Sequence, residues 1–400
     1  MRAIRDLLAV ALACALLGGS LGGCAHGGGS RAAATTGNAS ASVTGSGTSS
    51  ASRTSTLPAI APSDILEPPS YQGFEPLPIF TYHTVDPKLK NFIAITPAVF
   101  EAQLKILKSG GYNAITARDL VAHQTSGTPL PPKPVMISFD DGWRNQYVYA
   151  EPLLKKYGFK ATFFINPQPI SKGYPGYLTT AMVRGLAKDG NDIESHTWRH
   201  LSMIRTAGQD AATFQRKNIT QLTFSTSWIK RVTGQTPVAI CYPFGFYDTE
   251  AIGMAQRAGY KAGFTVDEGV ADARPWDAFG LKRFTIDPTQ SLADFRDRLQ
   301  SGPVPVTDIQ PPPATRVAGI TTTVSADITA VPPSIGHLTM TSGPSMKGLH
   351  VETRDGRRYL VAVIRRAKTG LRTIEVRGSD AGGREYVSSW VIVLGDPVPK

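Results

Sequence analysis

The stretch Val135-Met136-Ile137-Ser138-Phe139-Asp140-Asp141-Gly142 joins a run of apolar and small residues to two adjacent aspartates and a glycine. The run has the length of a buried strand bounded by a turn. Asp-Gly is a turn signal, so the acids could belong to an ordinary turn. At the end of a buried strand, however, the two carboxylates would repel each other with little solvation, and a bound cation would relieve that repulsion.

Short apolar runs of this kind recur along residues 74–300, with helical patterns between several of them. One helix is expected to begin after Thr96 as N-cap, with Pro97 in its first turn, and to stop at Gly110-Gly111. Strands that alternate with helices predict an α/β domain with parallel strands, as a barrel or an open sheet. The predicted strands are Leu77–Thr81, Val135–Phe139, Ala161–Ile165, Asp192–Ser195, Val238–Tyr242, Ala262–Val266 and Leu281–Ile286.

Polar residues follow three of these strands, where α/β folds carry their chemistry. His83 follows the first strand, Asp140 and Asp141 the second, and His196 and His200 the fourth. The His-x-x-x-His spacing places two imidazoles on one side of a helical turn, and Asp141 would add a carboxylate. This donor set suits zinc, with iron, nickel or cobalt as alternatives. The alternative without function is a histidine pair on the surface.

Three segments together resemble a known family. Ser138–Gly142, Ser195–His200 and Cys241–Gly245 are similar, in order and separation, to three motifs of the polysaccharide deacetylases of carbohydrate esterase family 4, the NodB-type domain. The resemblance covers about residues 75–300 and implies a deformed (β/α) barrel of about seven strands. Pro78–His83 further resembles the branch of the poly-β-1,6-N-acetylglucosamine deacetylases.

The resemblance implies a role for each polar residue at the strand ends. Asp141, His196 and His200 would hold a divalent metal ion. Asp140 would accept the proton of the attacking water as the base. His83 would protonate the departing nitrogen as the acid, because this branch places its acid in the N-terminal Tyr-His segment.

This chain departs from the wider family at Cys241, where an arginine usually orients the catalytic carboxylate. The orienting role would pass to Arg283, for which an ordinary surface cation is the alternative. The resemblance assigns the backbone N–H of Phe244 to the oxyanion hole. Three aromatic residues are candidates for sugar platforms or an acetyl pocket, with ordinary core packing as the alternative: Trp198, Tyr242 and Trp276. The remaining histidines outside the motifs are expected to be surface or structural residues: His123, His337 and His350.

The N-terminal region is expected to direct export and lipidation. Residues 1–23 have a charged start, a short apolar run and a small-residue end, which describe a signal peptide. Leu21-Gly22-Gly23-Cys24 resembles the bacterial lipoprotein processing box, which implies acylation of Cys24; the alternative is an ordinary secretory signal. Residues 24–73, rich in Gly, Ser, Thr and Ala, are expected to form a flexible tether.

Beyond residue 300 the composition changes. Residues 301–313 are rich in proline and are interpreted as a linker. Residues 314–400 contain β-branched segments with hairpin turns at Asp355-Gly356 and Asp380–Gly383, which predict a small all-β, immunoglobulin-like sandwich. Its expected strands are Ala314–Thr329, Leu349–Val351, Tyr359–Ile364, Arg372–Arg377 and Tyr386–Leu394.

Composition limits the classes of function. The 400 residues carry 42 Lys and Arg against 31 Asp and Glu, a net charge of +11, but no long run of basic residues, so no nucleic-acid partner is expected. The leading hypothesis is a metal-dependent enzyme that removes N-acetyl groups from an N-acetylglucosamine polymer. It would be anchored in the bacterial cell envelope, on the periplasmic face of the outer membrane where two membranes exist, with polysaccharide export machinery as a further candidate partner. The alternatives are a peptidoglycan N-deacetylase, an O-acetyl esterase, and a polysaccharide-binding lipoprotein without activity.

Overall fold

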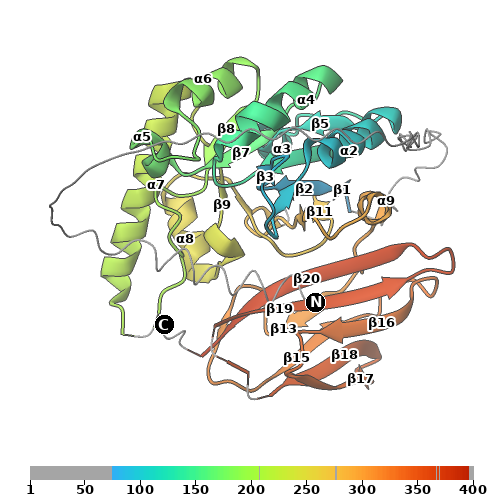
Figure 1. Ribbon diagram of the computed structural model, residues 1–400. Coiled ribbons are helices and arrows are strands. Elements are labelled where there is room, and N and C mark those ends of the chain that lie inside the picture. The colour runs from blue at the N-terminus through green and yellow to red at the C-terminus, as the bar shows by residue number, and fades with distance from the viewer. Residues whose placement is uncertain (1–73, 207, 275–276, 366, 369, 396–400) are drawn as a thin grey trace, which may run out of the picture. The chain divides into compact units, whose positions relative to one another are not determined.

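The computed structural model describes residues 74–206, 208–274, 277–365, 367–368 and 370–395 (Figure 1). Its first part is built on a sheet whose neighbouring strands all run parallel. The strand order is β10 (Ala262–Phe264), β9 (Ala239–Cys241), β8 (Asp192–Ser195), β7 (Thr162–Ile165), β6 (Pro134–Phe139), β2 (Ile79–Tyr82) and β12 (Phe284–Thr285), and β5 (Asn113–Ile115) also pairs with β6. Each predicted run overlaps one of these seven strands.

Residues 281–286 connect the two ends of this strand order. The N–H of Leu281 donates to the carbonyl of Gly263 on the β10 side (2.9 Å), and that of Ile286 donates to the carbonyl of Thr81 on the β2 side (2.9 Å). The sheet therefore curves round into a deformed, irregularly closed barrel, which confirms the predicted α/β fold.

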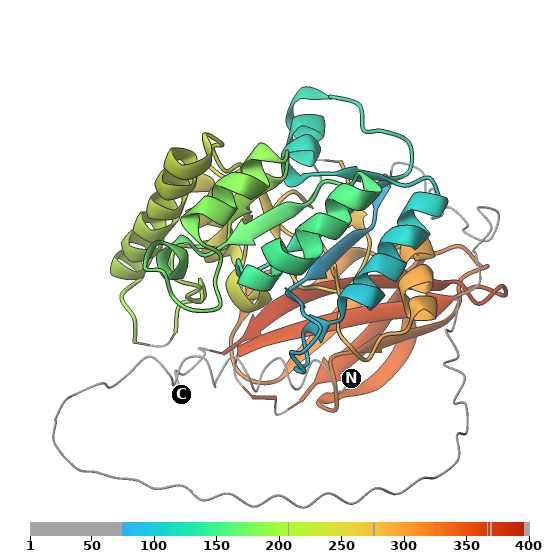
Figure 2. The ribbon, with the colours of Figure 1, turned by 45° about the horizontal axis from the view of Figure 1, so that its top comes forward.

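Helices cover the outer face of this sheet, and Figure 2 shows those coloured cyan to green lying over the strands. The helix predicted after Thr96 is present as α2 (Pro97–Ser109), with the Thr96 hydroxyl accepting the N–H of Val99 and Gly110 following its end. The other helices are α3 (Ala117–Ser126), α4 (Glu151–Tyr157), α5 (Pro167–Ser171), α6 (Thr180–Lys188), α7 (Ala211–Thr233), α8 (Thr249–Arg257) and α9 (Leu292–Gln300).

Aromatic side chains fill the core near the strands that carry the candidate site. The Phe139 ring stacks on Phe163 with centroids 4.9 Å apart and on Tyr82 at 5.5 Å, and Phe100 of α2 meets the edges of Tyr82 and Phe139. Each of these side chains is almost fully buried. Burial of one such ring contributes about 1.5–3 kcal/mol, so the strand ends beyond Phe139 and Tyr82 are anchored by a close-packed core.

The second part is the predicted all-β sandwich. Its two sheets have the orders β13-β15-β18-β17 and β14-β20-β19-β16, with all pairs antiparallel except β14 with β20. Side chains of both sheets, among them Leu360 and Ile392, share one core. The strands are β13 (Thr307–Gln310), β14 (Arg316–Val317), β15 (Thr322–Asp327), β16 (Gly336–Thr341), β17 (Met346–Arg354), β18 (Arg357–Ile364), β19 (Gly370–Ser379) and β20 (Glu385–Leu394).

The sandwich starts earlier than the sequence indicated. Thr307–Gln310 lies within the segment interpreted as a linker, yet it pairs with β15 as strand β13. Strand β16 (Gly336–Thr341) was also not expected. Two short pairs complete the described strands, β1 (Pro76–Leu77) with β11 (Ala271–Asp272) and β3 (Thr84–Val85) with β4 (Ala94–Ile95). Among the described residues no helix has the length and apolar character needed to cross a membrane.

Candidate active site

Asp140, the first residue after β6, is held by Arg283 from the segment that connects the barrel ends. The guanidinium donates to both carboxylate oxygens, with Nη1 2.9 Å from Oδ1 and Nη2 2.7 Å from Oδ2. Such a bidentate pair fixes the plane of the carboxylate as well as its charge. The two residues are separated by 143 positions in the chain, and the curvature of the sheet brings them together.

Arg283 is itself buried and held by further hydrogen bonds. Its side chain is fully buried, which excludes the alternative of a surface cation. Its Nε donates to the carbonyl of Thr265 (2.7 Å), and Nη1 donates to the hydroxyls of Thr81 (2.9 Å) and Ser138 (3.3 Å). Because all these partners lie on barrel strands or their extensions, the arginine can hold the carboxylate in one orientation.

The charge of this pair is stable at neutral pH. Burial alone would raise the pKa of Asp140, but the charge and hydrogen bonds of Arg283 outweigh burial and lower the pKa to about 2. The pKa of Arg283 is raised by the same carboxylate against the effect of burial. Asp140 is therefore an ionised acceptor at neutral pH.

Cys241, at the end of β9, completes the surroundings of this pair. Its Sγ lies 3.0 Å from Nη2 of Arg283 and 3.4 Å from Oδ2 of Asp140. Burial raises the pKa of the thiol, so the cysteine stays a neutral neighbour of both charged groups.

Asp141, His196 and His200 converge beside Asp140. The Oδ1 of Asp141 lies 3.5 Å from Nε2 of His196 and 3.4 Å from Nε2 of His200, and the two Nε2 atoms are 3.1 Å apart. All three donor atoms lie within 4.8 Å of one another. The three residues follow the ends of two strands, β6 and β8, which are separated in the sheet by β7.

The chemistry of these donors fits a divalent metal ion. The Nδ1 of His196 lies 2.7 Å from the carbonyl oxygen of Cys241 and must carry a proton to donate there, so in the neutral imidazole the lone pair is on Nε2. That lone pair faces Nε2 of His200, so the two nitrogens can share one proton or one cation between them. Two imidazoles and a carboxylate are a common ligand set for catalytic zinc and for iron, nickel and cobalt.

Three contacts that the sequence analysis missed orient this cluster. The indole Nε1 of Trp143 donates to Oδ2 of Asp141 (2.9 Å), and the amide of Asn166 donates to the carbonyl of His196 (2.5 Å). The third contact is the hydrogen bond from Nδ1 of His196 to the carbonyl oxygen of Cys241. The proximity of Trp143 to the aspartates in the chain was a usable signal, whereas the other two contacts depend on the pairing of distant strands.

The backbone at the site takes up an uncommon conformation. Asp141, Thr197, His200 and Phe244 all have positive φ angles between 57° and 74°. Such conformations cost energy and persist where surrounding contacts impose them, often at functional sites. Gly142 also has positive φ, and a Cβ there would lie 3.2 Å from Cγ2 of Ile165, so the turn after the aspartates has little room for a side chain.

His83 lies near Asp140, with its Nε2 4.0 Å from Oδ2 of the carboxylate. The amide of Gln146 donates to the carbonyls of both His83 (2.8 Å) and Asp140 (2.6 Å), which ties the two strand ends together. Gln146 opens η2 (Gln146–Ala150), a single π-helical turn, a feature frequent at functional sites. The His83 side chain is 13% exposed, and its Nδ1 is buried without a hydrogen-bond partner among the described residues.

The predicted substrate-facing aromatics fall into different environments. The ring of Phe244 is half-buried and lies 4.4 Å from that of His200, which places it beside the cluster. Tyr242 is fully buried and its hydroxyl donates to the carbonyl of Phe279, so the alternative of core packing describes it. Trp198 is half-buried and contacts Phe224. Trp276 and the lipidation candidate Cys24 lie outside the described residues.

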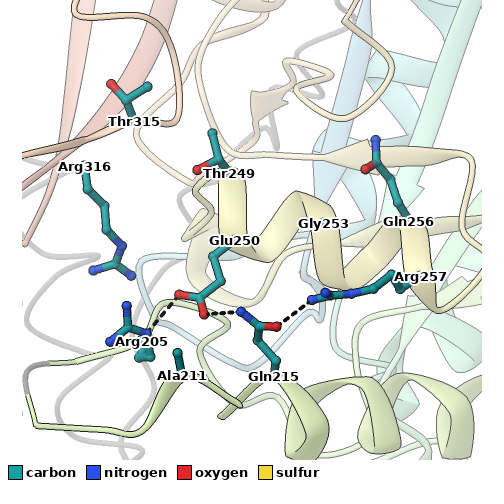
Figure 3. Close-up of a pocket in the computed structure, with 10 residues that line it drawn as sticks. All are labelled: Arg205, Ala211, Gln215, Thr249, Glu250, Gly253, Gln256, Arg257, Thr315 and Arg316. Carbon is teal, nitrogen blue, oxygen red and sulfur yellow. Dashed lines mark hydrogen bonds and ion pairs between the residues drawn. The ribbon is translucent and has the colours of Figure 1, made fainter. Parts of the chain in front are cut away.

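The remaining histidines lie apart from the cluster, as expected. His123 bridges Glu75 and the carbonyl of Thr128, His350 contacts Glu352, and His337 is exposed. A wide pocket of about 1000 Å³ also lies elsewhere, near α7 and α8 (Figure 3). Its polar groups are largely paired with one another, Arg205 and Gln215 with Glu250, and Arg257 with Gln215, and it contains none of the predicted site residues.

Comparison with known proteins gives the family of this curved α/β sheet with two aspartates at the end of β6. The family model for polysaccharide deacetylase matches residues 127–263. YxkH of Bacillus subtilis (strain 168), which bears the name of a polysaccharide deacetylase, is 32% identical over 225 residues, covering 56% of this chain and 76% of its own length. The chain therefore belongs to the polysaccharide deacetylase family.

More distant relatives include poly-β-1,6-N-acetyl-D-glucosamine N-deacetylases. That of Escherichia coli (strain K12) is 22% identical over 62% of this chain, and that of Staphylococcus aureus (strain MRSA252) is 27% identical over 45%. The matches span 42% and 63% of the lengths of these two relatives.

Solved structures support the same fold. The deacetylase PplD of Streptococcus pyogenes in complex with acetate is 26% identical, with a TM-score of 0.50, and the match covers 56% of this chain and 99% of that one. The de-N-acetylase of Aggregatibacter actinomycetemcomitans has the same TM-score at 21% identity, which shows the fold alone.

Proposed function

We propose that this protein is a metal-dependent polysaccharide N-deacetylase acting on a polymer of N-acetylglucosamine of the poly-β-1,6-linked type. The observation that carries the proposal is the placement of Asp140. It is held by Arg283 on one side and lies against the Asp141, His196 and His200 cluster, with His83 4.0 Å away. A buried ionised base, a site for a divalent ion and an acid are the groups that amide hydrolysis requires.

Asp141, His196 and His200 would hold the divalent ion. When bound, such an ion supplies Lewis-acid chemistry, lowering the pKa of a water molecule and polarising the acetyl carbonyl. The hydrogen bond from Trp143 orients Asp141, and the hydrogen bond of Nδ1 to the carbonyl of Cys241 orients His196.

The protein's own residues would act as the general base and the general acid. Asp140 accepts the proton of the attacking water while Arg283 holds its carboxylate in plane. The water oxygen bonds to the acetyl carbon, and the backbone N–H of Phe244 donates to the oxyanion that forms. As the carbon–nitrogen bond breaks, His83 gives its proton to the departing amine, and acetate is the second product.

The linkage of the polymer is inferred from two features. Tyr82 ends β2 and His83 follows it near Asp140, in a segment that resembles the Tyr-His segment of that branch, and N-deacetylases of poly-β-1,6-N-acetyl-D-glucosamine are among the relatives. We also infer anchoring through a lipid on Cys24 in the cell envelope, from the processing box at Leu21–Cys24. Incorporation of labelled fatty acid, lost in Cys24→Ala, tests the anchor independently of activity.

Acetate release from a panel of substrates tests the proposed activity. Metal-reloaded protein is offered β-1,6-linked N-acetylglucosamine oligomers, chitin oligomers, peptidoglycan and acetylated xylan, beside Asp140→Asn and the control Asp297→Asn on an exposed face of α9. Release from the first substrate, abolished in Asp140→Asn and retained in Asp297→Asn, supports the proposal. Preferential release from peptidoglycan or xylan would show that the proposed substrate is wrong. No acetate release from any substrate would refute the proposed enzymatic activity.

A further inference from the structure

Residues 265–269 follow β10 without regular secondary structure, and they hold Arg283. The carbonyl of Thr265 accepts the Nε–H of Arg283 (2.7 Å), and the carbonyl of Asp267 accepts the backbone N–H of Arg283 (3.0 Å). We call residues 265–269 the arginine-holding segment. Both the guanidinium and the main chain of the arginine that orients Asp140 therefore depend on the position of this segment.

Two residues of the barrel contact the arginine-holding segment. The hydroxyl of Tyr247 donates to Oδ2 of Asp267 (2.9 Å), and Nη2 of Arg298 on α9 donates to Oε1 of Glu268 (2.8 Å). Backbone outside a strand ladder has no regular pattern of hydrogen bonds to fix it. Its position therefore depends on individual contacts of this kind.

The sandwich contacts the same segment through β19 and β20. The hydroxyl of Ser389 on β20 is buried and donates to the carbonyl of Glu268 (2.7 Å). The Nη2 of Arg377 on β19 lies 3.4 Å from Oε2 of Glu268. Gly269 lies so close to β20 that a Cβ there would be 3.3 Å from the carbonyl oxygen of Val387. Two strands of the sandwich therefore fix the end of the arginine-holding segment.

Glu268 links the two parts of the chain by charge as well. One of its carboxylate oxygens accepts from Arg298 of the barrel, and the other lies beside Arg377 of the sandwich. The Glu268 side chain is 24% exposed, and partly exposed ion pairs contribute little to stability. A carboxylate bound by guanidinium groups of two separate elements nevertheless fixes their relative position, because such contacts are directional.

The contacts form one continuous series from the sandwich to the proposed base. Ser389 and Arg377 fix Glu268, the segment that contains Glu268 holds Arg283, and Arg283 orients Asp140. Arg283 and Asp140 are buried, so a displaced guanidinium would leave a carboxylate without its partner in a site shielded from water. Misplacement of a catalytic group by about 1 Å can cost about 100-fold in rate.

We propose that the C-terminal sandwich is a positioning module of the active site. In this proposal Ser389 and Arg377 are positioning residues, which keep the arginine-holding segment where it fixes Arg283 against Asp140. The effect on catalysis rests on the proposed deacetylase function, whereas the effect on Arg283 does not. The sandwich thereby takes part in the reaction without any need to contact the polysaccharide.

Exchange of the Arg283 Nε–H with water, followed by NMR on the full chain, tests the proposal without any need for activity. The signal is assigned by its loss in Arg283→Lys. This N–H is buried and bonded to Thr265, so it should exchange slowly in the native protein. We expect exchange at least about tenfold faster in Ser389→Ala and in Arg377→Met. Arg377→Lys, which keeps a cation beside Glu268, should remain closer to the native rate.

Ser388→Ala and Arg354→Met are the matched controls. Ser388 lies next to the tested serine but donates to the carbonyl of Val304, and Arg354 pairs with Glu352 on the edge strand β17. Both controls should show the native exchange rate. Unchanged exchange in both test variants, or an equal increase in the controls, would overturn the proposal whatever the activity.

Steady-state kinetics of acetate release measures the effect on the reaction. Because the two positioning residues act through Arg283, kcat should fall at least about fivefold in Ser389→Ala and Arg377→Met, while KM changes less than about twofold. The controls should keep the native kcat. Faster exchange together with a native kcat would overturn the positioning role. If the native protein releases no acetate but exchange rises as expected, the proposed function fails and the hold of the sandwich on Arg283 stands.

Discussion

The Nη2 of Arg283 lies 3.0 Å from the Sγ of Cys241, and the small thiol leaves the space that the guanidinium occupies beside Asp140. In the wider deacetylase family that the sequence resembles, an arginine at the position of Cys241 usually orients the carboxylate that corresponds to Asp140. In this structure Arg283 makes that contact from the strand segment that connects the two ends of the sheet. The position of the guanidinium thus depends on a small residue at 241.

This relationship predicts effects of different size for two substitutions of Cys241. Cys241→Ser keeps the small size and a polar atom near Nη2, so we expect kcat to change less than about threefold. Cys241→Met adds volume in a fully buried position and displaces the guanidinium, so kcat should fall at least about tenfold. Steady-state kinetics with thermal melting checks both, and equal activity of the two variants would contradict the role of Cys241 as a spacer.

The buried pair of Arg283 and Asp140 predicts a compensating double variant. Arg283→Met leaves a buried carboxylate without its partner and should lower the free energy of unfolding by about 3–5 kcal/mol. Asp140→Asn in the same chain removes that charge and should restore part of the loss, without restoring activity. Urea unfolding of the two single variants and the double variant measures the coupling. Additive losses would show that the pair is not coupled.

His83 is predicted to act on catalysis rather than on metal binding. His83→Gln should reduce kcat by about 100-fold or more, because His83 lies beside Asp140 and is the proposed proton donor to the leaving amine. Its metal content, measured by atomic emission, should equal that of the native protein, since His83 is not among the three converging donors. His337→Gln, at an exposed position in the sandwich, is the control. Native activity in His83→Gln would remove the histidine from the mechanism.

Glu151 predicts a dependence of stability on pH. Burial raises the pKa of this carboxyl to about 7, although Lys155 and the hydrogen bond from Asn191 oppose the shift. The pKa of Glu151 is higher in the folded than in the unfolded state, so the folded state favours the protonated carboxyl. The stability that this gives is fully present below about pH 4.5 and is lost as the pH rises through about 7. Glu151→Gln should therefore gain stability relative to the native protein by about 1–3 kcal/mol at about pH 8, but not at about pH 4.

Urea unfolding at the two pH values measures this difference. Glu101→Gln is the control of opposite sign, because the hydrogen bond from Lys156 lowers the pKa of Glu101. It should show no gain at the higher pH. A gain of equal size for Glu151→Gln at both pH values would mean that the carboxyl does not titrate between them.

Much of the fold could be predicted because its determinants are local. The apolar run before Asp140 predicted β6, and Asp192–Ser195 was predicted with the bounds that the structure has for β8. Strand β13 was missed because Thr307–Gln310 is largely exposed and carries no apolar alternation, so only its pairing with β15 makes it a strand. Sequence patterns report burial, and an exposed edge strand gives little of that signal.

The candidate site, too, could be predicted only in part from the sequence. The motifs located Asp140, Asp141, His196 and His200, because their residue types and spacing carry the chemistry. The burial of Arg283 could not be settled from the sequence, since a lone arginine after a lysine is equally typical of a surface. Gln146 and Asn166 were missed because their amides act on backbone carbonyls of other segments, which only the three-dimensional pairing reveals.

The measurement that tests the central claim most directly is acetate release as zinc is titrated into metal-stripped protein with a β-1,6-linked N-acetylglucosamine oligomer. We predict that activity rises in proportion to bound metal and saturates at about one ion per chain, as expected for a single three-donor site. Asp141→Asn should bind the ion more weakly and release little acetate. Full activity in the stripped protein, or saturation of a zinc, iron, nickel and cobalt series without any acetate release, would contradict the account.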